Sequence, residues 1–109
     1  MACKYKITVT SRAILTGVTA SLNNKTVVMM AQPGRRKYIS EEVKRDADPQ
    51  DKIEIDVHIR GRMDSSVTIT VENITREEEI FSETGIIGSQ PKSSGTRYEV
   101  IDEKVRSKC

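Results

Sequence analysis

The residues from Ile53 to Val71 alternate between apolar and polar side chains, and this pattern constrains the fold more than any other. The apolar residues of the first segment are Ile53, Ile55, Val57 and Ile59. The alternation resumes over 67–71, after a break that contains Gly61. Successive side chains of a strand point to opposite faces, so alternation of this length is typical of half-buried strands. Two such segments around a Gly-containing break predict a β-hairpin.

The expected hairpin has one register that keeps its apolar residues on a single face, because a slip of one residue would turn them all to the other face. That register pairs Ile59 with Val67, Val57 with Ile69 and Ile55 with Val71. The connecting loop would then run over residues 60–66, which is long for a hairpin.

Other short apolar segments recur along the chain, with turn residues between them at intervals of about ten residues. This spacing predicts an all-β fold, a small β-sandwich of Ig-like or jelly-roll-like kind, as a single β-rich domain over residues 1–109. Residues 88–96 are rich in Gly, Ser and Pro and are expected to form a mobile loop. Residues 102–109 are expected to form a charged, poorly ordered tail.

Two segments, 40–45 and 76–83, fit either a helix or a strand. Ser40 could cap a short helix, or the segment around it could be a strand. Thr75 and Glu78 match a capping box, which favours a helical turn, although the residues that follow also fit a strand. We therefore expect a sandwich with at most two short helical turns.

The charge balance and the apolar runs restrict the class of partner. The chain has 18 Lys and Arg against 16 Asp and Glu, and this near balance argues against a general nucleic-acid binder, which normally carries a clustered basic surface. The longest apolar run, 27–31, is far shorter than the roughly 20 residues of a membrane span, so no membrane insertion is expected. Without an apolar leader segment, a cytoplasmic protein or a mature exported domain is expected.

The two cysteines, Cys3 and Cys109, lie at opposite ends of the chain. Chain termini are often close together, so a disulfide between them is geometrically possible. In a reducing compartment they would be thiols, and a terminal residue is expected to fray. We therefore expect two free thiols.

The acid-rich loop over 46–51 is the best candidate for a metal site. Asp46, Asp48 and Asp51 could donate oxygen ligands to Ca²⁺, although their spacing is not that of an EF-hand. The alternative is a solvated turn in which aspartate side chains accept hydrogen bonds from backbone N–H groups. Apart from this calcium hypothesis, no cofactor is expected.

His58 is the only histidine, and the alternation places it on the polar face of the central segment near Asp56. A histidine beside a carboxylate can act as a general base, which makes a small hydrolase-like enzyme one hypothesis. A flat sheet face offers no pocket that excludes water, and no catalytic motif is present. We therefore expect a surface histidine and no enzyme.

Two further sets of residues could contact a ligand or a partner. Arg35, Arg36 and Lys37 follow a Pro-Gly turn, where positive charge and backbone freedom could hold a phosphate group. Met29, Met30 and Tyr38 are the candidate interface residues, since methionine adapts readily to an interface.

These features favour the hypothesis that the protein is a non-enzymatic β-sandwich module. It would bind a protein partner, or a second copy of itself, through a sheet face or an exposed sheet edge. The alternative is a Ca²⁺- or carbohydrate-binding β-sandwich that uses residues 46–51. The enzyme centred on His58 is the third hypothesis.

Overall fold

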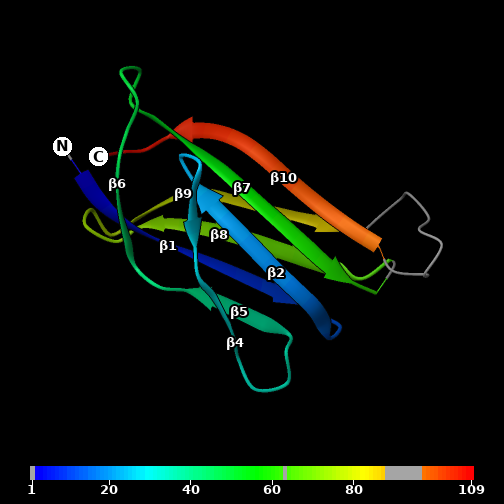
Figure 1. Ribbon diagram of the computed structural model, residues 1–109. Helices are drawn as coiled ribbons and strands as arrows, with labels where there is room; N and C mark the ends of the chain where they lie inside the picture. The colour runs from blue at the N-terminus through cyan, green and yellow to red at the C-terminus, as the bar shows by residue number, and fades with distance from the viewer. Residues whose placement is uncertain (1, 63, 88–96) are drawn as a thin grey trace.

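The computed structural model describes residues 2–62, 64–87 and 97–109, which form two antiparallel β-sheets packed face to face (Figure 1). The strands are β1 (Ala2–Ser11), β2 (Leu15–Leu22), β3 (Lys25–Val27), β4 (Met29–Ala31), β5 (Lys37–Ser40), β6 (Val43–Asp46), β7 (Lys52–Gly61), β8 (Ser66–Asn73), β9 (Glu78–Ile86) and β10 (Arg97–Arg106). The predicted all-β sandwich is therefore confirmed.

The first sheet has the strand order β4-β5-β1-β8-β9, and β6 also pairs with β1. Strands β5 and β6 share one edge of β1, with β6 along residues 2–5 and β5 along residues 8–10. The second sheet has the order β10-β7-β2-β3. Sheets that face each other in this way bury their inner side chains between them.

The core between the sheets is built from alternate residues of the strands in both sheets, those whose side chains face inward. The four apolar residues of the first central segment, Ile53, Ile55, Val57 and Ile59, are all buried. In β8 the inward residues Val67, Ile69 and Val71 are buried in the same way. The prediction of half-buried strands with their aliphatic sides inward is confirmed.

The prediction that these two strands form a central hairpin, however, is wrong. Strand β7 pairs with β2 and β10 in the second sheet, whereas β8 pairs with β1 and β9 in the first. Val67 lies opposite Ser11 and Gly85, not opposite Ile59. The two strands face each other across the core, so the connection between them passes from one sheet to the other. Alternation reports that one face of a strand is buried, but it does not identify the neighbouring strand.

The expected helical turns are absent from the described residues. The segment around Ser40 is divided between β5 and β6, which both pair with β1. The second segment forms most of β9, which pairs with β8. Thr75 does not cap a helix, because its Oγ1 accepts a hydrogen bond from the backbone N–H of Lys4 at 2.9 Å. Pairing with a neighbouring strand has overridden the local helix signals.

The apolar run 27–31 is divided between two strands, because it breaks at Val28 as the chain crosses from the second sheet to the first. Val28 itself is 55% exposed. At the other end, residues 102–106 belong to β10 and Ser107 is fully buried, so this tail is not poorly ordered. The predicted mobile loop, 88–96, lies outside the described residues.

The expectation of two free thiols is wrong, because Cys3 and Cys109 form a disulfide. Their Cα atoms lie 5.9 Å apart, and Figure 1 shows the two chain ends close together at one end of the sandwich. Strand β10 brings the C-terminus to the start of β1, and this proximity could not be read from a sequence separation of 106 residues. Within the part of the chain that the structure describes, no helix could span a membrane.

Candidate functional site

The outer face of the first sheet carries a group of hydroxyl side chains, which we call the hydroxyl face. Its members are Thr8 and Thr10 of β1, Ser66, Thr68 and Thr70 of β8, and Ser82 and Thr84 of β9. Each is exposed or half-exposed. No charged residue stands among these seven positions, although 31% of the chain is charged.

The register of three neighbouring strands brings these hydroxyl groups together. Thr70 of β8 lies opposite Thr8 of β1 on one side and Ser82 of β9 on the other. In the next row, Thr68 lies between Thr10 and Thr84. Residues directly opposite each other on antiparallel strands point to the same face, so the two rows form a regular array. Within each row the neighbouring strands are about 4.8 Å apart.

The sequence encodes this array as three short repeats in which a hydroxyl residue stands on each side of a residue at an inward register position. The repeats are Thr8-Val9-Thr10, Thr68-Ile69-Thr70 and Ser82-Glu83-Thr84. Our sequence analysis missed these residues, because hydroxyl residues are common in any β-protein. The repeats could have drawn attention to them, but only the register shows that they are adjacent.

Hydrogen bonds connect the hydroxyl groups of β8 and β9. The Oγ1 atoms of Thr68 and Thr84 are 2.8 Å apart, and Thr70 Oγ1 lies 3.4 Å from Ser82 Oγ. Burying a polar group is costly when it is left without a partner. Since these hydroxyls bond to each other, a partner can cover them at a lower desolvation cost than it could cover charged groups.

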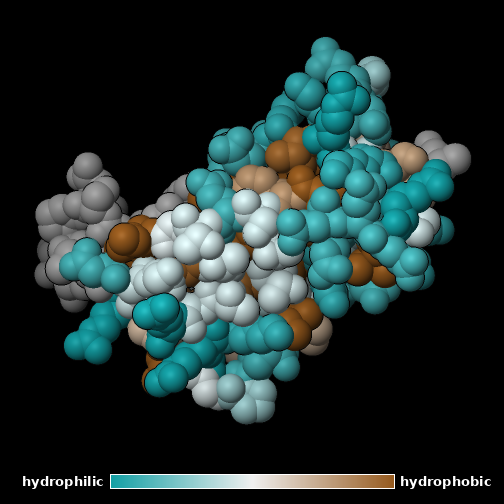
Figure 2. Space-filling view, turned by 180° about the vertical axis from the view of Figure 1, so that it is seen from behind, coloured by the Kyte–Doolittle hydropathy of each residue, from teal (hydrophilic) through white to brown (hydrophobic). Residues whose placement is uncertain are grey.

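Apolar side chains lie at two borders of the hydroxyl face. Met30 and Ile39 extend the row of Thr8 toward the β4 edge, and Ile86 lies opposite Ser66 at the end of β9. Met30 is 48% exposed and Ile86 is 63% exposed. Figure 2 views the molecule from this side and shows near-white side chains gathered within a mostly teal surface.

A shallow depression lies at one end of the hydroxyl face and has a volume of about 360 Å³. Its lining residues are Thr10, Ser11, Arg12, Ser66, Thr68 and Thr84. Beyond the opposite end, Lys6, Glu72 and Glu79 form a charged row across the same three strands. The uncharged surface is therefore bounded by charged side chains at both ends.

The edges formed by β9, β3 and β4 are less suited to a partner than this face. Glu83 lies opposite the buried Ile69, so an exposed carboxylate occupies an inward register position on the edge strand β9. The pairing of β9 is also interrupted by an irregularity beside Val71 and Glu72. Inward-pointing charges and bulges are devices that discourage pairing with another strand. Of the other edge strands, β3 and β4 have only three residues each, whereas β10 is a ten-residue edge strand of the second sheet.

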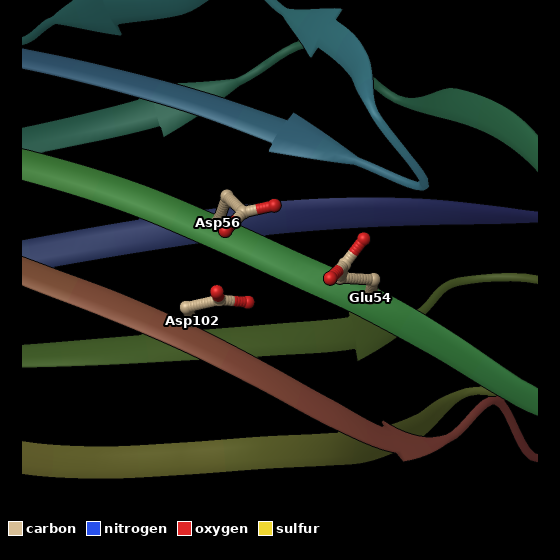
Figure 3. Close-up of side chains that lie close together, drawn as sticks. All are labelled: Glu54, Asp56 and Asp102. Carbon is tan, nitrogen blue, oxygen red and sulfur yellow. The ribbon is translucent and has the colours of Figure 1, made fainter.

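The outer face of the second sheet is charged, in contrast to the hydroxyl face. Glu54 and Asp56 of β7 lie close to Asp102 of β10, with one carboxylate oxygen of each within 4.8 Å of the others (Figure 3). Burial raises the pKa of the Asp56 carboxyl, and the negative charge of Asp102 raises it further. Ser21 donates a hydrogen bond to Asp56 Oδ2 at 3.5 Å. The register of β7 and β10 therefore holds like charges together.

The residues expected to bind calcium have other contacts. Asp48 Oδ1 accepts hydrogen bonds from the backbone N–H groups of Gln50 and Lys52, each at 2.9 Å, and the bond from Lys52 is the main reason that its pKa is lowered. Asp51 accepts a hydrogen bond from the hydroxyl of Ser107 at 2.6 Å. Asp46 ends β6. The contacts of Asp48 match the solvated turn that was the alternative reading.

His58 is exposed on the outer face of the second sheet, as the alternation predicted. It borders a shallow depression of about 280 Å³, lined by Gly17, Val18, Thr19, His58 and Arg60. Thr19 lies opposite His58 in the ladder between β2 and β7. The depression lies on an open sheet face, so His58 remains in contact with solvent.

The remaining candidate residues lie near the β4–β5 connection. Arg35 and Arg36 belong to this exposed turn, in which Gly34 has a φ of 89°, and Lys37 begins β5. Tyr38 is only 7% exposed and packs in the core, so it is not available to a partner. Met29 packs against the core, whereas Met30 borders the hydroxyl face. Of the predicted interface residues, Met30 is the one at this surface.

Comparison with known proteins supplies no relative from which a function could be transferred. No protein-family model, curated protein or solved structure matches the chain.

Proposed function

We propose that this protein is a non-enzymatic interaction module that binds a protein surface, either of a partner or of a second copy, through the hydroxyl face. The observation that supports the proposal is the charge-free character of seven neighbouring outward positions on three strands. In a chain with 31% charged residues, the remaining surface is rich in groups that resist desolvation.

The chemistry of the hydroxyl face suits a flat, uncharged partner surface. Threonine methyl groups supply apolar area, and the hydroxyls of Thr68 and Thr84 already bond to each other. Met30 and Ile86 add exposed apolar area at the borders, where a partner would gain most from contact. The centre of an interface is typically poor in charged residues, as this surface is.

A charge placed in the middle of the hydroxyl face tests the proposal. The variant Thr70→Glu adds a carboxylate between Thr8 and Ser82, and burying that carboxylate against an uncharged partner would be unfavourable. The matched control is Thr19→Glu, which adds the same charge at an exposed position on the outer face of the second sheet. Circular dichroism should show that both variants are folded.

Sedimentation velocity over a concentration series then measures self-association of the three proteins. If the wild-type protein forms a dimer, Thr70→Glu should weaken it at least tenfold and Thr19→Glu should not. If the wild-type protein is a monomer, chemical crosslinking in extracts of its own cells should give a protein adduct that Thr70→Glu loses and Thr19→Glu retains. Equal behaviour of the two variants in both assays would contradict the proposal.

The calcium or carbohydrate alternative has less support. Asp48 and Asp51 already accept hydrogen bonds from groups of the protein, so calcium binding by the loop over 46–51 would have to compete with these contacts. A specific calcium ion would stabilise the folded state and raise the melting temperature in millimolar Ca²⁺. An unchanged melting temperature would remove this alternative. The hydrolase hypothesis for His58 has no observation in its favour beyond the nearby depression.

A further inference from the structure

The last three residues, Ser107, Lys108 and Cys109, lie across one end of the sandwich, and we call them the C-terminal segment. Ser107 is fully buried, although it is polar and only two residues from the chain end. Its backbone N–H donates to the carbonyl of Asp51 at 2.9 Å, and its hydroxyl donates to the carboxylate of the same residue. The segment thus follows β10 directly and joins it to the loop before β7.

Buried polar groups of the first sheet also depend on this segment. The side-chain amide of Asn73 donates to the carbonyl oxygen of Ser107 at 3.0 Å, and the hydroxyl of Tyr5 donates to the same oxygen at 3.4 Å. Both side chains are fully buried. If the segment moved away, each would exchange its present partner for water, so the net contribution of these hydrogen bonds to the closed position is modest.

Two further contacts of the segment lie at the exposed surface. The Nζ atom of Lys108 lies 3.2 Å from Glu78 Oε1, and the guanidinium of Arg76 donates to the carbonyl of Cys109 at 3.0 Å. Exposed ion pairs contribute little to stability. The disulfide to Cys3 is therefore the one covalent hold on the segment beyond the end of β10.

We propose that the disulfide between Cys3 and Cys109 is a redox latch, whose reduction frees the C-terminal segment while the two sheets stay folded. The ten-residue ladder between β7 and β10 ends at Arg106 and does not include the cysteines. The core between the sheets consists mostly of aliphatic side chains, and Cys3 lies at its latch end. Opening is thus expected to be confined to this end of the molecule.

The two cysteine residues differ in exposure, which favours Cys109 as the site where reduction begins. Cys3 is 1% exposed, whereas Cys109 is only partly buried. A thiolate of a dithiol reductant attacks Cys109 Sγ and forms a mixed disulfide, and Cys3 leaves as a thiolate that takes up a proton. The second thiol of the reductant then displaces Cys109. Two electrons pass to the protein, two cysteine thiols form, and the reductant becomes a cyclic disulfide.

The latch lies at the opposite end of β1 and β8 from the depression on the hydroxyl face. Tyr5 and Asn73 pair at the latch end, and Ser11 and Val67 pair at the other. The latch is therefore independent of the proposed interaction surface. Either proposal can fail while the other holds.

Nuclear magnetic resonance relaxation of the full chain tests the latch, before and after reduction with dithiothreitol. In the oxidised protein the amides of Ser107 and Cys109 should have order parameters near 0.85, typical of rigid backbone. After reduction these values should fall below about 0.6, while the cross-strand contacts between β7 and β10 remain. The variant Cys109→Ser should reproduce the reduced state without any reductant.

A matched control is Lys108→Ala, which removes the exposed ion pair with Glu78 and leaves the disulfide in place. Its order parameters should stay at the oxidised values. Rigid amides at Ser107 and Cys109 in the fully reduced protein would overturn the latch, because the hydrogen bonds alone would then hold the segment. Loss of the contacts between β7 and β10 would also overturn it, since the disulfide would then support the whole fold.

Discussion

Gly61 shows how tightly side chains pack around one residue of the core. It is buried at the end of β7, and a Cβ atom added there would lie 2.9 Å from Leu15 Cδ2 and 3.0 Å from Ile87 Cδ1. Both neighbours are fully buried, so they have little room to move. The absence of a side chain, and not an unusual backbone angle, is what this position requires.

Replacing Gly61 by alanine should therefore destabilise the protein by about 1–3 kcal/mol, the usual cost of overpacking a core. The control is Gly17→Ala on β2, where an added Cβ meets nothing within 4 Å. That variant should be neutral, or more stable by about 0.5 kcal/mol because alanine restricts the unfolded chain. Urea unfolding of both variants measures the difference. Equal free energies of unfolding would contradict this account of the packing.

The surroundings of Asp56 in the folded protein are unfavourable for a negatively charged carboxylate. Burial and the neighbouring Asp102 raise the pKa of its carboxyl, so the folded state disfavours the ionised form. This repulsion is absent below the ordinary aspartate pKa of 3.8 and develops as the pH rises through the raised pKa of the folded protein. Stability associated with this group is therefore lost toward neutral pH.

The variant Asp56→Asn should be more stable than the wild-type protein at neutral pH, by about 0.5 kcal/mol, since it removes a directly opposed pair of like charges. The gain should disappear at pH values below 3.8, where wild-type Asp56 is protonated. Melting temperatures across this pH range measure the effect. A Glu42→Gln variant, on the exposed connection after β5, serves as a charge-matched control. A destabilised Asp56→Asn protein at neutral pH would refute the prediction.

At the scale of the strands, local sequence patterns predicted where the strands are, but they did not predict which strands pair with each other. The alternation after Ile53 correctly predicted β7 and β8 and the inward side of each, because burial of one face requires it. It could not show that the strands belong to different sheets. The same side chains are buried whether the two strands form a hairpin or face each other across the core. The loop expected over 60–66, which is long for a hairpin, was the available sign of a crossover, although the observed connection between β7 and β8 is shorter.

The same limit explains why the hydroxyl face escaped prediction. Thr8 and Thr70 are 62 positions apart in the sequence, and only strand register makes them neighbours. Cys3 and Cys109 likewise meet only because β10 returns to the start of β1. By contrast, the exposure of His58 and the turn formed by Asp48 followed from local pattern alone.

A further prediction at this scale concerns the edge strand β9. Glu83 occupies an inward register position opposite Ile69, yet it is exposed at the edge. Replacing it with valine should leave the fold intact and remove a charge that discourages pairing with another strand. Light scattering during incubation at high concentration should show aggregation of Glu83→Val sooner than of wild type. A Glu42→Val control lies outside the strands and should not aggregate faster. No difference between the two variants would count against this role for Glu83.

Considered as a whole, the molecule has two outer faces of opposite character on one aliphatic core. The second sheet presents the carboxylates of Glu54, Asp56 and Asp102, which are costly to bury. The first sheet presents the hydroxyl face, with its side chains bonded to each other and apolar residues at its borders. The difference between the faces, rather than any single residue, is the basis for assigning the interaction surface.

The most direct test of that assignment follows threonine methyl resonances while the protein concentration is raised, or while a partner found by crosslinking is added. Threonines on both faces report in one spectrum. Shifts confined to the hydroxyl-face threonines Thr8, Thr10, Thr68, Thr70 and Thr84, with Thr19 and Thr26 unchanged, are the predicted result. Shifts at Thr19 and Thr26, with the hydroxyl face unchanged, would contradict it.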